Sequence, residues 1–218
     1  MAFGAKLLAW ATLMLAALLV PAGALTVKSV EARAGLLWIG NSSSEGAPSP
    51  LLDTLGFAVP ISITPAISFA PELDFTGTQY QLQVYSDPTR AVPTEVEFAN
   101  SVWYLGILLD FPLRYTFTLS KQTSLGFGVS PALVLRIPTV SWGTGASEAG
   151  AMSAYLFGKG RFFYPTAQVF FDWQVLSGLA LEFRLRSFFP IFHLWDGEGL
   201  PFWDQMMIDG NIGFRFSL

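Results

Sequence analysis

The chain ends in the eleven residues Ile208-Asp-Gly-Asn-Ile-Gly-Phe-Arg-Phe-Ser-Leu218. In an extended conformation, one face of this stretch carries Ile, Gly, Ile, Phe, Phe and Leu, and the other carries Asp, Asn, Gly, Arg and Ser. This period of two predicts a β-strand with one apolar face. Aromatic side chains on that face are typical of a strand that contacts lipid.

Seven earlier stretches alternate in the same way. By residue number they are 30–38, 55–63, 67–75, 103–117, 125–137, 167–175 and 179–185. Short turns join some of them, at 64–66, 120–123 and 177–178. Long connections rich in Gly, Ser, Pro and acidic residues join the others, at 41–54, 76–98, 143–160 and 193–204. Eight strands with connections of alternating length predict an all-β fold, an antiparallel up-and-down barrel with both termini at the end of the short turns.

The composition indicates that this barrel spans a membrane. The 218 residues are 52% hydrophobic, 15% aromatic and only 13% charged, whereas charged residues make up about a quarter of a soluble domain. A bundle of transmembrane helices needs apolar runs of roughly 20 residues. The one run that approaches this length is 7–20, so the apolar residues are dispersed along strands, as a transmembrane β-barrel requires.

The N-terminal segment has the three parts of a secretory signal peptide. Lys6 supplies the positive charge, 7–20 the apolar core, and Pro21-Ala-Gly-Ala24 the small residues before a cleavage site. We expect residues 1–24 to be removed and 25–218 to form the barrel. The alternative is an uncleaved membrane anchor, although 7–20 is short for a span.

The mature chain has neither cysteines nor a basic cluster. With no cysteine there is no disulfide, no thiol nucleophile and no lipid-modified N-terminal cysteine. Without Lys6 the chain has 11 basic and 16 acidic residues, a net charge of about −5. Nucleic acid is therefore not an expected partner.

Thirteen charged residues fall on the polar face of the strands and are predicted to form a hydrogen-bonded network inside the barrel. They are Glu31, Arg33, Glu72, Asp74, Asp110, Arg114, Arg136, Asp172, Glu182, Arg184, Arg186, Asp209 and Arg215. No charge is placed on the lipid face within the bilayer, where Arg or Lys costs roughly 2 to 4 kcal/mol at the midplane. The hairpin at 177–178 predicts that Asp172 pairs with Arg184.

The chain resembles small eight-stranded outer-membrane barrels of the OmpW, OmpX and OmpA transmembrane-domain type, with OmpW favoured. The resemblance rests on the architecture and on Ile212, Phe214, Phe216 and Leu218, which are similar to the C-terminal signal read by the outer-membrane assembly machinery. It implies an exported protein of the bacterial outer membrane, with membrane lipid and that machinery as partners. Leu218 departs from the aromatic residue with which such chains usually end. Several prolines fall in or near the strands: Pro60, Pro71, Pro112, Pro131, Pro138, Pro165 and Pro190.

Residues with catalytic or ligand-binding chemistry are few. His193 is a conceivable general base, since some eight-stranded barrels are lipid A deacylases. The pattern of those deacylases has Ser two residues after His, however, and Trp195 stands at that position here. The favoured interpretation is an interfacial histidine in an aromatic girdle with Trp195, Phe202 and Trp203. Glu72 and Asp74 are assigned to the hydrogen-bonded network in preference to a metal site. No enzyme activity, cofactor or metal is predicted.

Two functions remain open. The first is a narrow channel or uptake pathway for small hydrophobic molecules, which the OmpW resemblance implies. Its candidate apolar lining is Tyr104, Leu108, Val134, Phe162, Tyr164 and Phe170. The second is a structural or surface-binding barrel that does not conduct and whose long loops contact an extracellular partner.

Overall fold

The computed structural model describes residues 26–27, 29–42, 49–83, 89–94, 101–141, 143 and 145–218. The predicted signal peptide, 1–24, lies outside these residues. Within the described ranges, none of the helices is long and apolar enough to cross a membrane.

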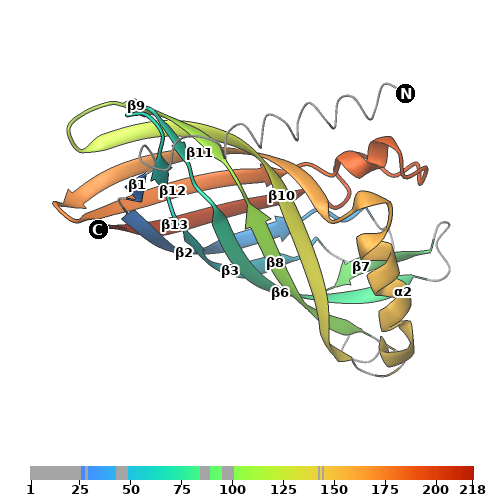
Figure 1. The fold of residues 1–218 in the computed structure, drawn as a ribbon. Helices are drawn as coiled ribbons and strands as arrows, with labels where there is room; N and C mark the ends of the chain where they lie inside the picture. The colour runs from blue at the N-terminus through green and yellow to red at the C-terminus, as the bar shows by residue number, and fades with distance from the viewer. Residues whose placement is uncertain are drawn as a thin grey trace.

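Eight strands close into an antiparallel barrel, as the sequence predicts (Figure 1). In chain order they are β2 (Ser29–Ile39), β3 (Leu51–Ala58) continued by β4 (Ile61–Ser62), β5 (Ile67–Phe69) continued by β6 (Glu72–Gln83), β8 (Val102–Asp110) continued by β9 (Leu113–Thr118), β10 (Thr123–Ser141), β11 (Phe163–Leu176), β12 (Leu179–Phe188) and β13 (Met207–Ser217). A short β1 (Thr26–Val27) pairs with β4. The ring closes because β13, the last strand, pairs along its whole length with β2.

Prolines divide three of the eight strands. Pro60 separates β3 from β4, Pro71 separates β5 from β6, and Pro112 separates β8 from β9. Proline has no N–H to donate and therefore interrupts the ladder of a closed sheet. Pro138 marks a register shift between β10 and β8. These four of the prolines singled out in the sequence therefore mark strand ends or a bulge.

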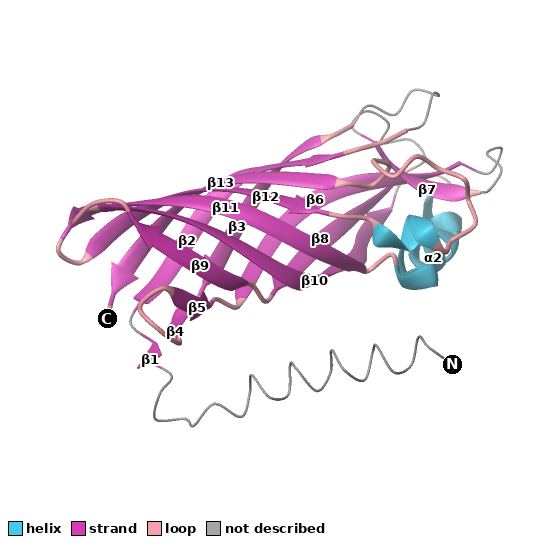
Figure 2. Ribbon diagram, turned by 90° about the horizontal axis from the view of Figure 1, so that it is seen from above, coloured by secondary structure: helices cyan, strands magenta, loops and turns pink. Residues whose placement is uncertain are grey.

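The two ends of the barrel differ in construction (Figure 2). One end, here called the turn end, has the connections β4–β5, β9–β10 and β11–β12 together with the C-terminus. The other, the loop end, carries helix α2 (Gly145–Phe157), strand β7 (Arg90–Thr94), and the short helices η2 (Gly158–Gly160) and η3 (Ile191–Leu194).

The long connections contain more regular structure than the sequence predicts. The expected loop 41–54 already contains the start of β3 at Leu51, and the loop 76–98 contains most of β6 and all of β7. These two strands pair with each other beyond the ring, from Gln79–Thr94 to Gln83–Arg90. The loop 143–160 contains α2. The polar side chains of Gln79, Gln81 and Gln83 interrupt the apolar alternation, so a search for that pattern does not detect the second half of β6.

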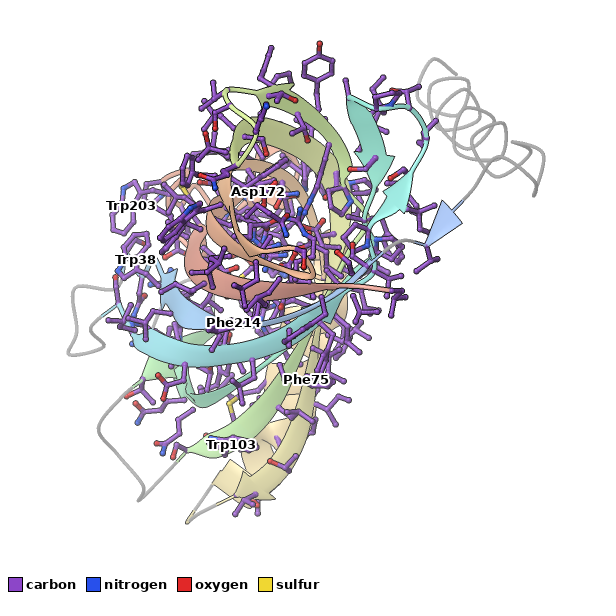
Figure 3. The ribbon with its side chains drawn as sticks, turned by 90° about the vertical axis from the view of Figure 1, so that its left-hand side faces the viewer. Trp38, Phe75, Trp103, Asp172, Trp203 and Phe214 are labelled. Atoms are coloured by element: carbon purple, nitrogen blue, oxygen red, sulfur yellow. The ribbon has the colours of Figure 1, made fainter. Side chains whose placement is uncertain are left out.

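Side chains alternate between an apolar outer wall and a polar interior along each strand. In β13, Ile212, Phe214 and Phe216 are exposed on the outside, whereas Asp209 and Asn211 are buried inside. Seen from the turn end, Asp172 lies within the ring, and Trp38 and Trp203 lie outside it (Figure 3).

One charge contradicts the expected sorting. Asp53 is exposed on the outer face of β3, between the outward-facing Leu51 and Leu55. The sequence did not predict an outward-facing charge here because residue 53 was assigned to a loop, whereas β3 begins two residues earlier. The position is close to the loop end of the strand.

Candidate functional site

The middle of the lumen and its turn end are filled by charged side chains. Of the thirteen charged residues assigned to the interior, the structure buries twelve and leaves only Arg215 partly exposed. Glycines on the inner face make room for them. A Cβ atom at Gly56 would lie 1.8 Å from Oδ1 of Asp74, so no larger residue fits beside this carboxylate without moving it.

Glu72 lies at the centre of this charged layer. Its carboxylate lies within ion-pair distance of four guanidinium groups, at 3.0 Å from Arg33, 2.5 Å from Arg114, 2.7 Å from Arg184 and 2.8 Å from Arg186. These arginines come from β2, β9 and β12, so Glu72 of β6 ties distant parts of the barrel wall together.

Arg186 is the cationic counterpart of Glu72. Besides Glu72 it contacts Asp74 at 2.7 Å, Asp110 at 3.0 Å and Asp209 at 2.6 Å. Arg186 is among the largest fully buried side chains. Ion pairs with this many charge-assisted hydrogen bonds offset the cost of removing the groups from water.

The predicted pair Asp172–Arg184 is wrong. Asp172 binds Arg215 instead, with 2.5 Å between Oδ1 and Nη2, while Arg184 binds Glu72. A bulge between Gln174 and Leu176 shifts the register next to the 177–178 turn. As a result Asp172 lies directly opposite Glu182, and Arg184 opposite Phe170.

Apolar side chains replace charged ones toward the loop end. Among the predicted lining residues, Leu108, Val134 and Tyr164 belong to one buried cluster and Tyr104 to a second. Phe170 is buried as well, but deeper, where the Arg114 guanidinium lies 5.0 Å from its ring centre.

Phe162 does not line the lumen. Its side chain is 36% exposed, because β11 begins only at Phe163 and residue 162 belongs to the turn that follows η2. The alternating pattern directs the Phe162 side chain inward only if β11 begins one residue earlier, at residue 162.

Helix α2 and the short helix η3 cover the apolar part of the lumen. Met152 and Leu156 of α2 are buried against Tyr80 and Tyr104. Phe192 of η3 packs edge-on against Tyr164, with 5.5 Å between ring centres. These covering residues were not predicted from the sequence. The spacing of Met152 and Leu156 by four, within an alanine-rich segment, is the signal that would have indicated a helix with one buried face.

A small cavity remains between the charged layer and this cover. Its volume is about 10 Å³, enough for about one water molecule. It is lined by Leu37, Ile39, Thr76, Thr78, Tyr80, Tyr104, Gly106, Leu108, Val134, Arg136 and Met207.

A second polar network holds the cover in place. The Arg161 guanidinium binds Glu198 and lies 4.0 Å from the ring centre of Tyr155, and the Tyr155 hydroxyl lies 3.1 Å from Glu198. Burial raises the pKa of Tyr155 above its ordinary value, so this residue remains a neutral phenol at physiological pH. Arg90 of β7 pairs with Asp204, 3.4 Å away. None of these five residues was predicted from the sequence to form part of a polar network.

His193 is part of this cover and not of the membrane rim. Its side chain is only 3% exposed, with Nδ1 2.8 Å from Oδ2 of Asp196 and Nε2 2.9 Å from the carbonyl oxygen of Asp204. The expectation of an interfacial histidine was therefore wrong. The 3₁₀ turn of η3 directs the ring inward, whereas Trp195 and Trp203 remain exposed.

Comparisons with known proteins identify the fold. The crystal structure of Neisserial surface protein A (NspA) is similar, with a TM-score of 0.56, 10% sequence identity, and coverage of 89% of this chain and 99% of that chain. The structure of OprG from Pseudomonas aeruginosa matches with a TM-score of 0.43 and 8% identity over 88% of this chain and 97% of that one. The solid-state NMR structure of AlkL matches with a TM-score of 0.34 and 15% identity over 88% of each chain. No family model and no curated protein sequence matches.

The chain therefore has the fold of the small transmembrane β-barrels of bacterial outer membranes. The two halves of its lumen differ in chemistry: a charged layer in the middle and at the turn end, and an apolar region beneath a helical cover at the loop end.

Proposed function

We propose that this barrel takes up small, mainly apolar molecules at its loop end, and that it has no permanently open, water-filled pore along its length. The observation that carries the proposal is the division of the lumen. The apolar part could hold a hydrocarbon group, whereas the ion pairs around Glu72 and Arg186 oppose the passage of ions.

The cover determines how a solute would enter. Short barrels of this kind orient their turns toward the periplasm and their long loops outward, so α2 and η3 would face the outside. Because they pack over the lumen mainly through Met152, Leu156 and Phe192, an apolar solute would replace these contacts with equivalent ones.

The proposal includes no catalytic step. Both ring nitrogens of His193 are engaged by oxygen atoms, of Asp196 and of the Asp204 main chain. The ring in this arrangement has no free nitrogen to accept a proton from a substrate.

The test is binding of octan-1-ol to the full barrel in lipid nanodiscs, with empty nanodiscs measuring partition into lipid. We expect saturable binding above that background, weakened in Gly106→Val, where the added side chain enters the cavity. Ala154→Ser, an exposed change on α2, is the matched control. Binding indistinguishable from that of empty nanodiscs would contradict the proposal.

A surface-binding barrel is the second candidate. The side chains of Leu194 and Trp195 at the loop end are 75% and 50% exposed, which favours contact with a partner or with the membrane rim. A barrel that neither binds octan-1-ol nor conducts ions would favour this candidate.

The proposed location is the bacterial outer membrane, reached by export with a signal peptide cleaved after Ala24 and by insertion through the assembly machinery. Mass spectrometry of protein from outer-membrane fractions should give a chain beginning at Leu25. Deletion of 214–218 should prevent insertion. A chain that retains residues 1–24 would show that the segment is an anchor.

A further inference from the structure

Arg136 differs from the other arginines of the lumen. Within the residues that the structure describes, Arg33, Arg114, Arg184, Arg186 and Arg215 each pair with at least one carboxylate, whereas no carboxylate lies within 4.0 Å of Arg136. Arg136 is nevertheless 96% buried, with 4% of its surface exposed. A buried cation without a counter-ion is unfavourable and is retained only when other groups or a ligand compensate for it.

The described groups that contact Arg136 are neutral. It donates hydrogen bonds to the Tyr164 hydroxyl, 3.2 Å away, and to the Arg161 carbonyl oxygen, 3.3 Å away. Its guanidinium lies 5.9 Å from the ring centre of Tyr80 and 5.8 Å from that of Tyr164. These contacts hold the side chain in position, but none of the described residues that make them supplies an anion for its charge.

Arg136 lines the 10 Å³ cavity together with a second polar group that lacks a partner. The hydroxyl oxygen of Thr76 is buried and makes no hydrogen bond in the structure. Gly106 is the register partner of both residues, on β8 between Thr76 of β6 and Arg136 of β10. Because Gly106 has no side chain, the cation and the hydroxyl line one space across it.

The remaining wall of the cavity is mostly hydrocarbon. It is formed by Leu37, Ile39, Leu108, Val134 and Met207. A molecule that fits both parts of this wall has an apolar body and one anionic group. A planar carboxylate suits a guanidinium, which binds it through two parallel hydrogen bonds.

We propose that the loop half of the lumen binds a small apolar monocarboxylate. Its carboxylate accepts hydrogen bonds from Arg136 and from the Thr76 hydroxyl, and its hydrocarbon chain packs on the leucine, isoleucine, valine and methionine side chains of the wall. This inference rests on the proposed uptake function and specifies its substrate class.

Helix α2 has to move to admit such a molecule, because the cavity holds only about one water molecule. The Tyr104 hydroxyl joins the cavity wall to α2, at 3.3 Å from the Ala149 carbonyl oxygen and 3.2 Å from the Ser153 hydroxyl. Withdrawal of Met152 and Leu156 from Tyr80 and Tyr104 would enlarge the cavity toward the loop end.

The experiment compares three probes of one chain length, octanoate, octan-1-ol and octylammonium, by equilibrium dialysis near pH 8. The full barrel in nanodiscs is used, with empty nanodiscs as background. The variants are Arg136→Met, Arg136→Lys and Thr76→Val. Lys159→Met is the matched control, since it removes a cation whose side chain is 50% exposed and which does not line the cavity.

The wild-type barrel should bind octanoate about ten- to a hundredfold more tightly than octan-1-ol, the range expected for a charge-assisted hydrogen bond. Arg136→Met should remove this preference, Arg136→Lys should keep part of it, and Lys159→Met should keep all of it. Thr76→Val should weaken octanoate binding about fivefold and leave octan-1-ol binding unchanged.

Equal wild-type affinity for octanoate and octan-1-ol would overturn the carboxylate inference and leave the uptake function standing. Absence of binding by all three probes would overturn both. Octylammonium binding as tight as octanoate would also overturn the inference. The folding of Arg136→Met is checked by the heat-modifiable gel migration of a folded barrel. If this variant does not fold, Thr76→Val tests the inference. An unchanged octanoate affinity in Thr76→Val would be incompatible with the proposed hydroxyl contact.

Discussion

The two halves of the lumen are built from the same strands but are held together in different ways. Toward the turn end, Glu72 and Arg186 join side chains of several strands, so each contact spans the barrel. Toward the loop end, the contacts of Met152, Leu156 and Phe192 join a cover to the wall, and the wall closes without them. We conclude that the charged half determines the stability of the barrel, and that the apolar half is free to change shape for a ligand.

Removal of Glu72 should have the largest effect. Glu72→Ala leaves four buried arginines with fewer counter-ions and should lower the free energy of unfolding by about 3 to 5 kcal/mol. Urea unfolding of the detergent-solubilised barrel measures it. Lys121→Gln, in the exposed β9–β10 turn, should change stability by less than about 0.5 kcal/mol. A similar, small change in both variants would refute the structural role of the charged layer.

Truncation of the cover should have a large but local effect. Leu156→Ala removes a buried side chain, a change that costs roughly 2 to 5 kcal/mol in a protein core. Here we expect the cost to appear as faster proteolysis within α2, while the urea midpoint of the barrel stays unchanged. Ala154→Ser should leave both measurements as in the wild type. A lower urea midpoint of the barrel, accompanied by faster proteolysis of the helix, would show that the two halves are not independent.

Two glycine substitutions compare the packing of the halves directly. At Gly56, a new Cβ would lie 1.8 Å from Asp74, so Gly56→Ala should displace this carboxylate from Arg33 and cost about 1 to 3 kcal/mol. At Gly106, the nearest atom is the Thr76 methyl carbon at 2.7 Å, next to the cavity. Gly106→Ala should therefore cost less than about 1 kcal/mol. The reverse order in urea unfolding would mean that the loop half is the more rigid one.

The smallest effect is expected at the outward-facing Asp53. Replacement by leucine removes a charge from the outer wall and should raise stability by up to about 1 kcal/mol, since the position is near the loop end of β3. A loss of more than about 1 kcal/mol, measured in the same way, would reveal an interaction of this carboxylate that stabilises the barrel.

Local alternation was sufficient to predict the barrel, because lipid outside and polar groups inside impose a period of two on every strand. Alternation was also sufficient to predict that Arg33 and Glu182 are buried, because burial depends only on whether a strand residue points inward or outward. It failed for the pair Asp172–Arg184, since partners depend on the register, which places Asp172 opposite Glu182 and Arg184 opposite Phe170. It also failed for Phe162, which lies just before β11 and not within it, since β11 begins at Phe163.

The distinctive features of the loop half could not be predicted from periodicity. Strand β6 continues beyond the ring to pair with β7, and there Gln79, Gln81 and Gln83 stand where an apolar outer face would be expected. That no carboxylate of the described residues lies beside Arg136 depends on which side chains meet across the ring. In the sequence, Arg136 occupies the same kind of inward-facing strand position as the arginines that form ion pairs.

Ionic conductance is the most direct test of the divided lumen. Single-channel recording of the full barrel in a planar lipid bilayer should show no conductance steps, either alone or with octan-1-ol, because the ion pairs of Glu72 and Arg186 close the path while the solute occupies only the apolar half. Stable open-channel steps of the wild-type protein would contradict the account.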